Sequence, residues 1–326
     1  MSQVFVTGAS GFLGGHLVRE LLAAGCDVKA LSRRAETDAS ITTLGAKPVR
    51  AALDDTASLQ AALAGCEAVF HAAADTSMWK PNAAAQTATN VVGTQNLLRA
   101  AQAAGVQAFV HTSSISAWSH STHGLIHEDV PQQGGSSWIN YERSKYLSEQ
   151  AVRQAVLPWI VFNPAHILGP GDTHNWARLI VMVDREKLPG IPPGTGSFAD
   201  VRQIARVQVR AWQIKRFGQR YLLGGEKASF VEFVHRVGAA LGKRTPRGAM
   251  PPWALMAYAR INDAWSRVSG QEPGIAPESA ALTSHHADID SSKAMRELGY
   301  GLTPLDALLA DTLAWMQHEG MLTKRS

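Results

Sequence analysis

This sequence contains few cysteines and no long apolar run. Its 326 residues contain only two cysteines, Cys26 and Cys66. They have no metal-ligand spacing and suggest no disulfide framework, which fits a reducing cytoplasm. No apolar run reaches the ~18 residues that a membrane-spanning helix needs, and no charged leader or cleavage site precedes the first strand-like segment. We therefore expect a cytoplasmic protein that has no membrane span.

The chain also has only a small excess of positive over negative charge. Lys and Arg outnumber Asp and Glu by 31 to 27, and the resulting net charge of +4 is not gathered into a long basic run. This balance is poor evidence for a nucleic-acid partner, although a mild positive excess suits an anionic small molecule. Hydrophobic residues make up 45% of the chain, as in an ordinary globular protein. The length allows more than one domain-sized unit.

The most informative stretch lies at the start of the chain. Residues 4–6 form a short apolar β-type run, glycines follow at Gly8, Gly11 and Gly14, and an apolar pattern of helical period begins at Phe12. Glycine allows a sharp turn and lets a pyrophosphate approach the backbone, while the helix N-terminus supplies free N–H groups and positive potential. A turn that only packs a helix on a strand could carry the same glycines, but the strand–turn–helix context favours a dinucleotide site.

Segments of strand and helix period alternate through the first half of the chain. This alternation predicts an α/β fold with a doubly wound parallel Rossmann sheet, which binds ligands at the carboxyl ends of its strands. The predicted strands are 3–7, 27–31, 47–51, 67–72, 106–112, 158–163 and 221–223. The predicted helices are 12–24, 56–64, 83–104, 138–155, 200–216, 229–241 and 304–319. Proline and glycine break up the second half, so we expect a Rossmann domain (1–166 with 199–224) and a smaller, mixed substrate-binding domain (167–198 with 225–326).

The second predicted strand ends in Ser32-Arg33-Arg34. An acidic residue at this strand end would hydrogen-bond a ribose 2′-hydroxyl, whereas guanidinium groups bind a 2′-phosphate. We therefore expect Arg33, supported by Arg34, to select NADP over NAD, although a solvated basic loop would have the same sequence. After the third strand, Asp54 is a candidate for an adenine contact. Alternatively, Asp54 or Asp55 caps the following helix.

Two polar residues near the fourth predicted strand need buried partners. His71 ends this strand and could be catalytic, but a packed and hydrogen-bonded histidine is the commoner role there. Asn90 lies on a predicted helix face that is directed at the sheet, and we expect its amide to brace the active-site strand by hydrogen bonds. The small residues that follow His71 would let a flat cofactor lie on the backbone.

The chemistry becomes more specific at residues 141–145, Tyr-Glu-Arg-Ser-Lys. Tyr141 and Lys145 are four residues apart and therefore share one face of a helix. Tyrosine has a pKa of about 10, and a neighbouring ammonium group would lower it; Lys145 could also hold the nicotinamide ribose. Ser114, or alternatively Ser113, could donate a hydrogen bond to a substrate oxygen. A lone Y-x-x-x-K can be surface decoration, but with the glycine turn upstream it predicts a catalytic set.

Five motifs occur in order along nearly the whole chain: Thr7–Gly14, His71–Ala73, Thr112–Ser114, Tyr141–Lys145 and Asn163–Gly171. Together they resemble the extended short-chain dehydrogenase/reductase family, and within it the branch of dihydroflavonol reductases and 3β-hydroxysteroid dehydrogenases. The resemblance implies Ser114, Tyr141 and Lys145 as the catalytic triad, NADP or NAD as cofactor, and a homodimer formed by the helices near 83–104 and 138–155. The cofactor contacts that we expect are Gly8, Ser10, Gly11, Phe12, Leu13, Gly14, Arg33, Leu53, Asp54, Ala72, Ala73, Thr112, Tyr141, Lys145, Pro164 and Ile167.

Two further segments invite alternatives. The loop 113–137 contains His120, His123 and His127, but their spacing fits no compact metal site and no cysteine accompanies them, so we expect no metal. Such a loop more plausibly borders the substrate entrance. Residues 253–265 carry a stripe of Trp, Met and Tyr, which we expect to form core or a substrate lid rather than to touch a membrane surface.

Three functions are compatible with these motifs. The first is an NADPH-dependent reductase that acts on a ketone or aldehyde of a largely apolar small molecule. The alternative is a nucleotide-sugar epimerase or dehydratase that keeps NAD(P) tightly bound and returns the hydride. Against it, Ile115-Ser116 stands where related dehydratases usually have an acidic pair, and Ser197 stands where sugar-nucleotide enzymes tend to have a diphosphate-binding arginine. A third possibility, an NADP(H) sensor that binds a partner, would usually lack Tyr141 or Lys145.

Overall fold

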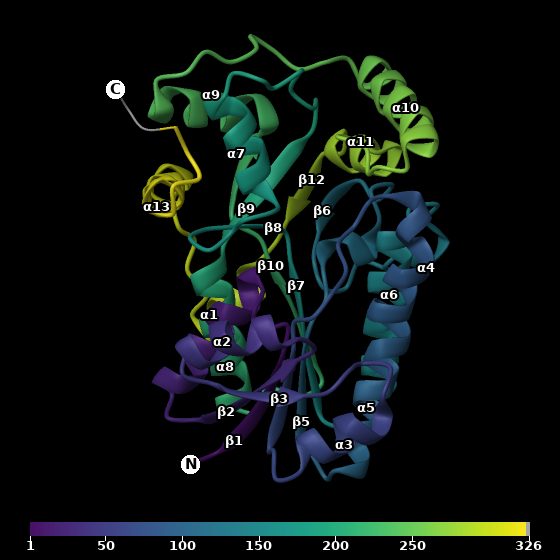
Figure 1. Cartoon of the computed structure of the whole chain (residues 1–326), viewed down its shortest axis with the longest axis vertical. Helices are drawn as coiled ribbons and strands as arrows, with labels where there is room; N and C mark the ends of the chain where they lie inside the picture. The colour runs from purple at the N-terminus through teal and green to yellow at the C-terminus, as the bar shows by residue number, and fades with distance from the viewer. Residues whose placement is uncertain (324–326) are drawn as a thin grey trace.

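The structure, a computed structural model, describes residues 1–323 and is built around a seven-stranded sheet (Figure 1). All neighbouring strands of this sheet are parallel, which confirms the predicted Rossmann architecture. From one edge to the other the strands are β3 (Lys47–Arg50), β2 (Asp27–Ser32), β1 (Gln3–Thr7), β4 (Ala68–His71), β5 (Ala108–Thr112), β7 (Trp159–Pro164) and β10 (Gln219–Leu223). The strand order changes direction between β1 and β4, which is where such sheets bind a dinucleotide.

Helices cover both faces of the sheet. The apolar residues of β1, Val4 to Val6, are fully buried because both of their faces are covered. One face packs against α1 (Phe12–Ala23), α2 (Ala35–Thr43), α8 (Val201–Gln213) and α12 (Ser292–Leu298). The other face packs against α3 (Thr56–Leu63), α5 (Gly93–Ala103) and α6 (Asn140–Arg153).

Two small sheets and a further apolar core are formed mainly by the second half of the chain. One sheet is mixed and contains β8 (His166–Leu168), β9 (Thr195–Asp200) and β11 (Glu226–Ser229); the other pairs β6 (Gly124–Ile126) with β12 (Ala287–Ile289). Aromatic rings fill this core, and those of Phe198 and Phe233 stack with their centroids 4.4 Å apart. Around it lie α7 (Trp176–Asp184), α9 (Phe230–Leu241) and α13 (Leu305–His318).

The structure refines several of the predicted elements. The predicted helix 83–104 is divided into α4 (Ala83–Thr87), a π-helical turn (Ala88–Val92) and α5. The helix α2 was not predicted, because Ile41 is its one buried residue and its sequence has almost no apolar periodicity. Asp55, and not Asp54, caps α3: its Oδ1 atom accepts hydrogen bonds of 3.1 Å from the N–H groups of Ala57 and Ser58.

The aromatic stripe at 253–265 was predicted wrongly in part. It belongs to α10 (Pro252–Ser269), and its Trp253 and Trp265 are exposed rather than in the core. The inward face of α10 is buried at Leu255 and Ala259, which pack against α11 (Pro277–Thr283). Within residues 1–323, no helix has the length and apolar character needed to cross a membrane.

Candidate active site

The glycine turn lies between β1 and α1. Gly8 has a φ of +75°, and a Cβ atom there would lie 2.8 Å from the backbone nitrogen of Ala73, so both the turn and its contact with the end of β4 require glycine. The N–H of Gly11 donates to the carbonyl of Gly8 at 2.9 Å. Among the described residues, no side chain caps α1, and its first turn has no acid. The N-terminus of α1 is therefore free to bind a pyrophosphate.

Three arginines gather where β2 and β3 end. Arg33 and Arg34 follow β2, and Arg50 is paired with Ser32 in the sheet. All three line the same cavity as the glycine turn. Arg50 donates to the Asp38 carboxylate at 2.5 Å and to Ser32 Oγ at 3.4 Å. Arg50 was not predicted from the sequence, although its place at the end of the strand next to β2 was a usable signal.

A single cavity of about 1560 Å³ is lined by all of the predicted cofactor residues. This volume exceeds the ~300–1,000 Å³ of an ordinary small-molecule pocket, so the cavity has room for a dinucleotide and a second molecule. Asp54 lines it at one end, where Asn96 donates a 2.8 Å hydrogen bond to the carbonyl of Leu53 and fixes the backbone. The residues fit a dinucleotide, and their individual roles as contacts stay predictions.

Tyr141 and Lys145 line this cavity from successive turns of α6. Burial raises the pKa of Tyr141, and a side-chain hydrogen bond with Ser114 opposes that effect. This direction differs from the expectation that Lys145 lowers the pKa of Tyr141; a raised pKa keeps the phenol protonated, which suits a proton donor. The alternative Ser113 has a buried Oγ atom without a hydrogen-bond partner in the described part of the chain. Both serines line the cavity, and the hydrogen bond with Tyr141 supports Ser114, whose role stays a prediction.

Lys145 is almost completely buried. It is 4% exposed, and its Nζ donates to the carbonyl of Thr112 at 3.2 Å. Burial lowers the pKa of Lys145 to about 8, and the carboxylate of Glu149, one turn farther along α6, acts in the opposite direction. Glu149 is itself held by Asn163 Nδ2 at 2.6 Å and by Arg220 at 3.1 Å. Glu149, which sequence analysis missed, thus helps Lys145 to keep its charge.

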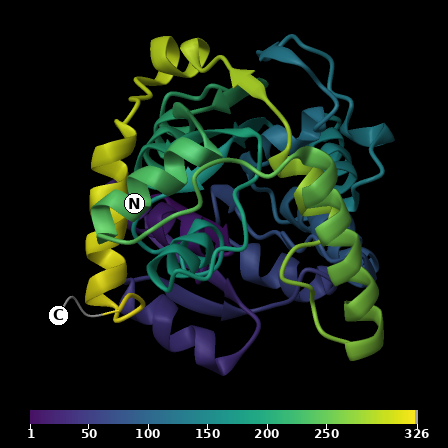
Figure 2. The ribbon, with the colours of Figure 1, turned by 90° about the horizontal axis from the view of Figure 1, so that it is seen from above.

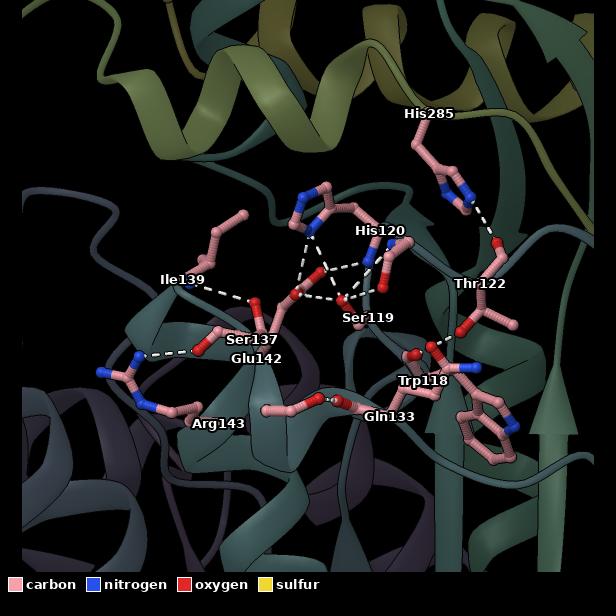
Figure 3. Close-up of polar contacts among 12 residues, drawn as sticks. Trp118, Ser119, His120, Thr122, Gln133, Ser137, Ile139, Glu142, Arg143 and His285 are labelled. Atoms are coloured by element: carbon pink, nitrogen blue, oxygen red, sulfur yellow. Dashed lines mark hydrogen bonds and ion pairs between the residues drawn. The ribbon is translucent and has the colours of Figure 1, made fainter.

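A second buried carboxylate, Glu142, follows Tyr141 in sequence, and Figure 3 shows it beside Ser119 and His120. It accepts hydrogen bonds from Ser119 Oγ at 2.7 Å, from the N–H of His120 at 2.6 Å and from His120 Nδ1 at 3.0 Å. Burial acts to raise the pKa of Glu142, but hydrogen bonds from His120, Ser137 and Ser119 outweigh it and the pKa is lowered. A charged carboxylate therefore orients His120, which lines the cavity. The pair of Glu142 and His120 was not predicted from the sequence.

Of the three histidines in the loop 113–137, His120 lines the cavity. In residues 1–323, no group of three or more His, Cys, Asp and Glu side chains is placed to hold a metal ion. The ring of His123 lies 5.8 Å from that of His285, whose Nε2 atom is 2.6 Å from the carbonyl of Thr122 (Figure 3). His285 lines the cavity as well; that the loop borders the substrate entrance stays a prediction.

His71 is packed and hydrogen-bonded, as expected. Its Nδ1 atom is 2.7 Å from Thr7 Oγ1, and its Nε2 atom is 2.9 Å from Thr94 Oγ1. The ring stacks on His111 with a centroid distance of 5.3 Å. Burial, with a smaller contribution from the charge of Lys145, lowers the pKa of His71 to about 3. Burial also lowers the pKa of His111 well below its usual value.

The buried imidazoles of His71 and His111 should make the folded protein less stable in acid. They stay neutral in the folded protein, whereas the unfolded chain protonates them below about pH 6.5, so the unfolded state binds more protons. The free energy of unfolding should therefore fall as the pH is lowered from about 6.5 toward 3. Urea unfolding at neutral pH and at about pH 4 measures this effect. His71→Asn should show a shallower decline, while a variant of the exposed His318 should keep the wild-type decline; a flat wild-type profile would contradict the prediction.

Asn90 braces the active site from the π-helical turn. Its Oδ1 atom accepts from the N–H of Asp75 at 2.7 Å, and its Nδ2 atom donates to the carbonyl of Asp75 at 2.8 Å and to Ser144 Oγ at 3.0 Å. The expected bracing is therefore present, but it ties the segment after β4 to α6 rather than holding the strand itself. Tyr141 and Lys145 are positioned by the same helix.

The far end of the cavity is formed by the second half of the chain and is largely apolar. Its apolar lining includes Leu179, Met182, Leu188, Met250, Leu255, Ile275, Leu282 and Ile289. The ring of His166 lies edge-on to Trp176 at 5.1 Å, and burial lowers the pKa of His166 to about 4, so this imidazole is neutral. Two exposed cations, Arg178 and Lys187, also line this end.

Known proteins are similar to this chain in sequence and in fold. The model of the NAD dependent epimerase/dehydratase family matches residues 4–224. A protein of Synechocystis sp., provisionally named a dihydroflavonol 4-reductase, is 30% identical over 97% of this chain and 95% of its own. "Sterol demethylase protein B" of Methylococcus capsulatus is 33% identical over 97% of this chain and 99% of its own. The crystal structure of gox2253 has a TM-score of 0.84 at 28% identity, covering 99% of this chain and all of that one.

Proposed function

The chain belongs to the NAD dependent epimerase/dehydratase family, and from that premise we propose that it is an NADPH-dependent oxidoreductase that reduces a ketone or aldehyde of a largely apolar small molecule. One observation carries the proposal: the cavity that joins Ser114, Tyr141 and Lys145 to the predicted nucleotide residues has a largely apolar far end. The names of the relatives, one referring to a reductase and one to a sterol, support the same substrate class.

Each side chain of the site has its own role in the proposed reduction. NADPH, when bound against the glycine turn, supplies the hydride. Tyr141 holds a proton on its phenolic oxygen and donates it to the carbonyl oxygen of the substrate. Ser114 donates a hydrogen bond to the same oxygen, where negative charge develops. Lys145, held by the carbonyl of Thr112, stabilises the phenolate that remains on Tyr141 and can also bind the nicotinamide ribose.

The epimerase or dehydratase alternative is favoured by one observation. Arg178 and Lys187 line the far end of the cavity and could bind a diphosphate. Ser197 does not assist there, because its Oγ atom donates to the carbonyl of Gly225 at 3.1 Å and accepts from its N–H at 2.8 Å. The sensor hypothesis is disfavoured by Tyr141 and Lys145, which both line the cavity.

The decisive experiment measures NADPH consumption with two substrate panels. One panel contains apolar aldehydes and ketones, and the other contains nucleotide sugars. We expect turnover of carbonyl compounds with stoichiometric loss of NADPH. Isomerisation or dehydration of a nucleotide sugar without net loss of NADPH, together with no turnover of any carbonyl compound, would establish the alternative instead.

Cofactor choice is proposed to depend on the arginines that surround the ends of β2 and β3. Replacement of Arg33 and Arg50 by alanine removes charge-assisted hydrogen bonds to a 2′-phosphate and should raise the Kd for NADPH by about 10- to 100-fold. The Kd for NADH, which has no such phosphate, should hardly change. Fluorescence titration of both cofactors measures this. The control is Arg19→Ala, which changes an exposed residue outside the cavity. An equal loss of affinity for NADPH and NADH in the Arg33 and Arg50 variant would contradict the selector role.

We also propose that the protein forms a homodimer through the outer faces of α5 and α6. Val92, at the end of the π-helical turn, and Leu147, on α6, are both large apolar side chains that are nearly half exposed. A pairing of these helices would bury them. Sedimentation at micromolar concentration should show a dimer, and Leu147→Asp should give a monomer; a wild-type monomer would overturn this proposal.

The domain boundaries, 1–166 with 199–224 and 167–198 with 225–326, and the cytoplasmic location remain proposals.

A further inference from the structure

The helix α10 lies at the outer edge of the molecule (Figures 1 and 2). One of its faces carries exposed apolar side chains. Trp253, Ile261, Trp265 and Val268 are 76%, 69%, 70% and 81% exposed. At 3.6 residues per turn these four positions fall within about a third of the helix circumference. The opposite side of α10 is buried, for example at Leu255. We call the four exposed residues the α10 face; a gathering of this kind on a surface marks a contact site.

Positive charge flanks the α10 face. Arg260 and Arg267 lie next to it on the helix, and Arg247 is exposed just before the helix begins. Arg247 and Arg260 have no ion-pair partner in the part of the chain that the structure describes. Arg267 pairs at 2.7 Å with Asp263, whose side chain is only 13% exposed. The described residues of α10 thus expose large apolar side chains and guanidinium groups but no carboxylate, and one exposed carboxylate, Glu272, follows the helix.

We propose that the α10 face docks the protein onto the surface of a lipid bilayer that contains anionic lipids. Indole rings are suited to the boundary between headgroups and acyl chains, and arginine side chains can lie along the apolar surface while their charged ends reach the phosphates. Anionic headgroups attract such charges. A second copy of the chain fits the face less well, because a twofold contact through it would bring Arg260 and Arg267 of the two copies toward each other.

The α10 face adjoins the apolar end of the cavity. Tyr258 is 38% exposed beside this face and also lines the cavity, as do Met250 and Leu255. An apolar molecule dissolved in the bilayer could therefore enter the cavity along α10 without first dissolving in water. This entry route rests on the proposed function, whereas the docking surface is independent of the reaction.

Flotation of the full chain with vesicles tests the docking. Vesicles of phosphatidylcholine and phosphatidylglycerol in equal amounts should carry the wild-type protein, vesicles of phosphatidylcholine alone should carry less, and high salt should weaken binding to the anionic vesicles. Since the assay needs no substrate, its failure is distinguishable from failure of the proposed function.

Two variants separate the contribution of the apolar side chains to vesicle binding from that of the arginines. The triple variant W253S/I261S/W265S should lower vesicle partitioning by at least about tenfold. The double variant R247Q/R260Q should lower it by about fivefold for each arginine, on anionic vesicles only. None of these residues lines the cavity, so NADPH binding and the thermal midpoint should match those of the wild type.

Matched controls come from the opposite end of the sheet. Val156 is 85% exposed between α6 and β7, and Arg153 is exposed at the end of α6; both come before β7 begins, far from the carboxyl ends of the strands. V156S and R153Q should bind vesicles as the wild type does. The proposal is overturned if the wild type does not float with anionic vesicles, or if the triple variant floats equally well. It is also overturned if sedimentation shows that the wild type self-associates through this face and the triple variant does not.

Discussion

Replacement of Tyr141 by phenylalanine should lower kcat for the best carbonyl substrate by about 10²- to 10⁴-fold, because it removes the proton donor and leaves the ring in place. Burial raises the pKa of this phenol, so the hydroxyl is protonated at neutral pH and ready to protonate the product oxygen. NADPH affinity should change little, since Gly8, Gly11 and Arg33 are untouched. Steady-state kinetics together with a fluorescence titration of NADPH measure both quantities.

Tyr146 offers a matched control on the same helix. Its ring packs near Gly135 and does not line the cavity. Tyr146→Phe removes the same atom outside the site and should leave kcat within about twofold of the wild type. Equal activity of Tyr141→Phe and the wild type would show that Tyr141 is not the acid; loss of NADPH binding in Tyr141→Phe would show that its main role is structural.

Gly14→Ala should abolish NADPH binding or prevent folding, and it is the second large effect that we expect. A Cβ atom at Gly14 would lie 1.9 Å from the carbonyl oxygen of Gly8 and 2.9 Å from the Cα atom of Ala9. Both neighbours are backbone atoms of the turn and cannot rotate away, so α1 would have to move from the end of β1. We expect NADPH affinity to fall by at least about 100-fold, because the N–H groups that should bind the pyrophosphate move with the helix.

The next residue provides the control for this substitution. A Cβ atom at Gly15 meets its nearest neighbour, the carbonyl oxygen of Ala9, at an ordinary distance of 3.7 Å. Gly15→Ala should therefore keep NADPH binding and should raise the thermal midpoint slightly, because alanine is a better helix former than glycine. Thermal unfolding and an NADPH titration of the two variants make the comparison. Similar behaviour of the two alanine variants would contradict the close packing of α1 on the turn.

Local sequence patterns were enough to predict most of the elements in the first half of the chain, where the predicted nucleotide site begins. The run of Val4 to Val6, the glycine spacing and the helical period after Phe12 act over a few residues, and the structure has β1, the turn and α1 as predicted. The same holds for Tyr141 and Lys145, because a spacing of four places two side chains on one face of any α-helix. The sequence could not assign the pKa direction of Tyr141, since burial of the phenol depends on segments that are distant in the chain.

Residues that act through distant partners were missed. Glu142 lies inside the recognised motif, yet only the fold brings Ser119 and His120 to its carboxylate. Arg50 reaches the cavity because β3 pairs with β2. No short-range pattern marks the contacts of Glu142, since they join residues that are about 20 apart in the chain. Arg50, by contrast, could have been found from its place at the end of the predicted strand 47–51.

The amino-acid sequence alone determined the alternating α/β fold, the glycine turn and the catalytic spacing, because each depends on periodicity or on neighbours within a single helical turn. Tertiary structure alone decided which side of α10 faces inward. Its sequence has apolar residues on nearly every side, so Trp253 and Trp265 could equally have been core. The packing of Leu255 and Ala259 on α11 used one side of the helix and left the tryptophans exposed. Burial is a property of the whole assembly of elements, and a helix does not encode which of its two apolar sides finds a partner.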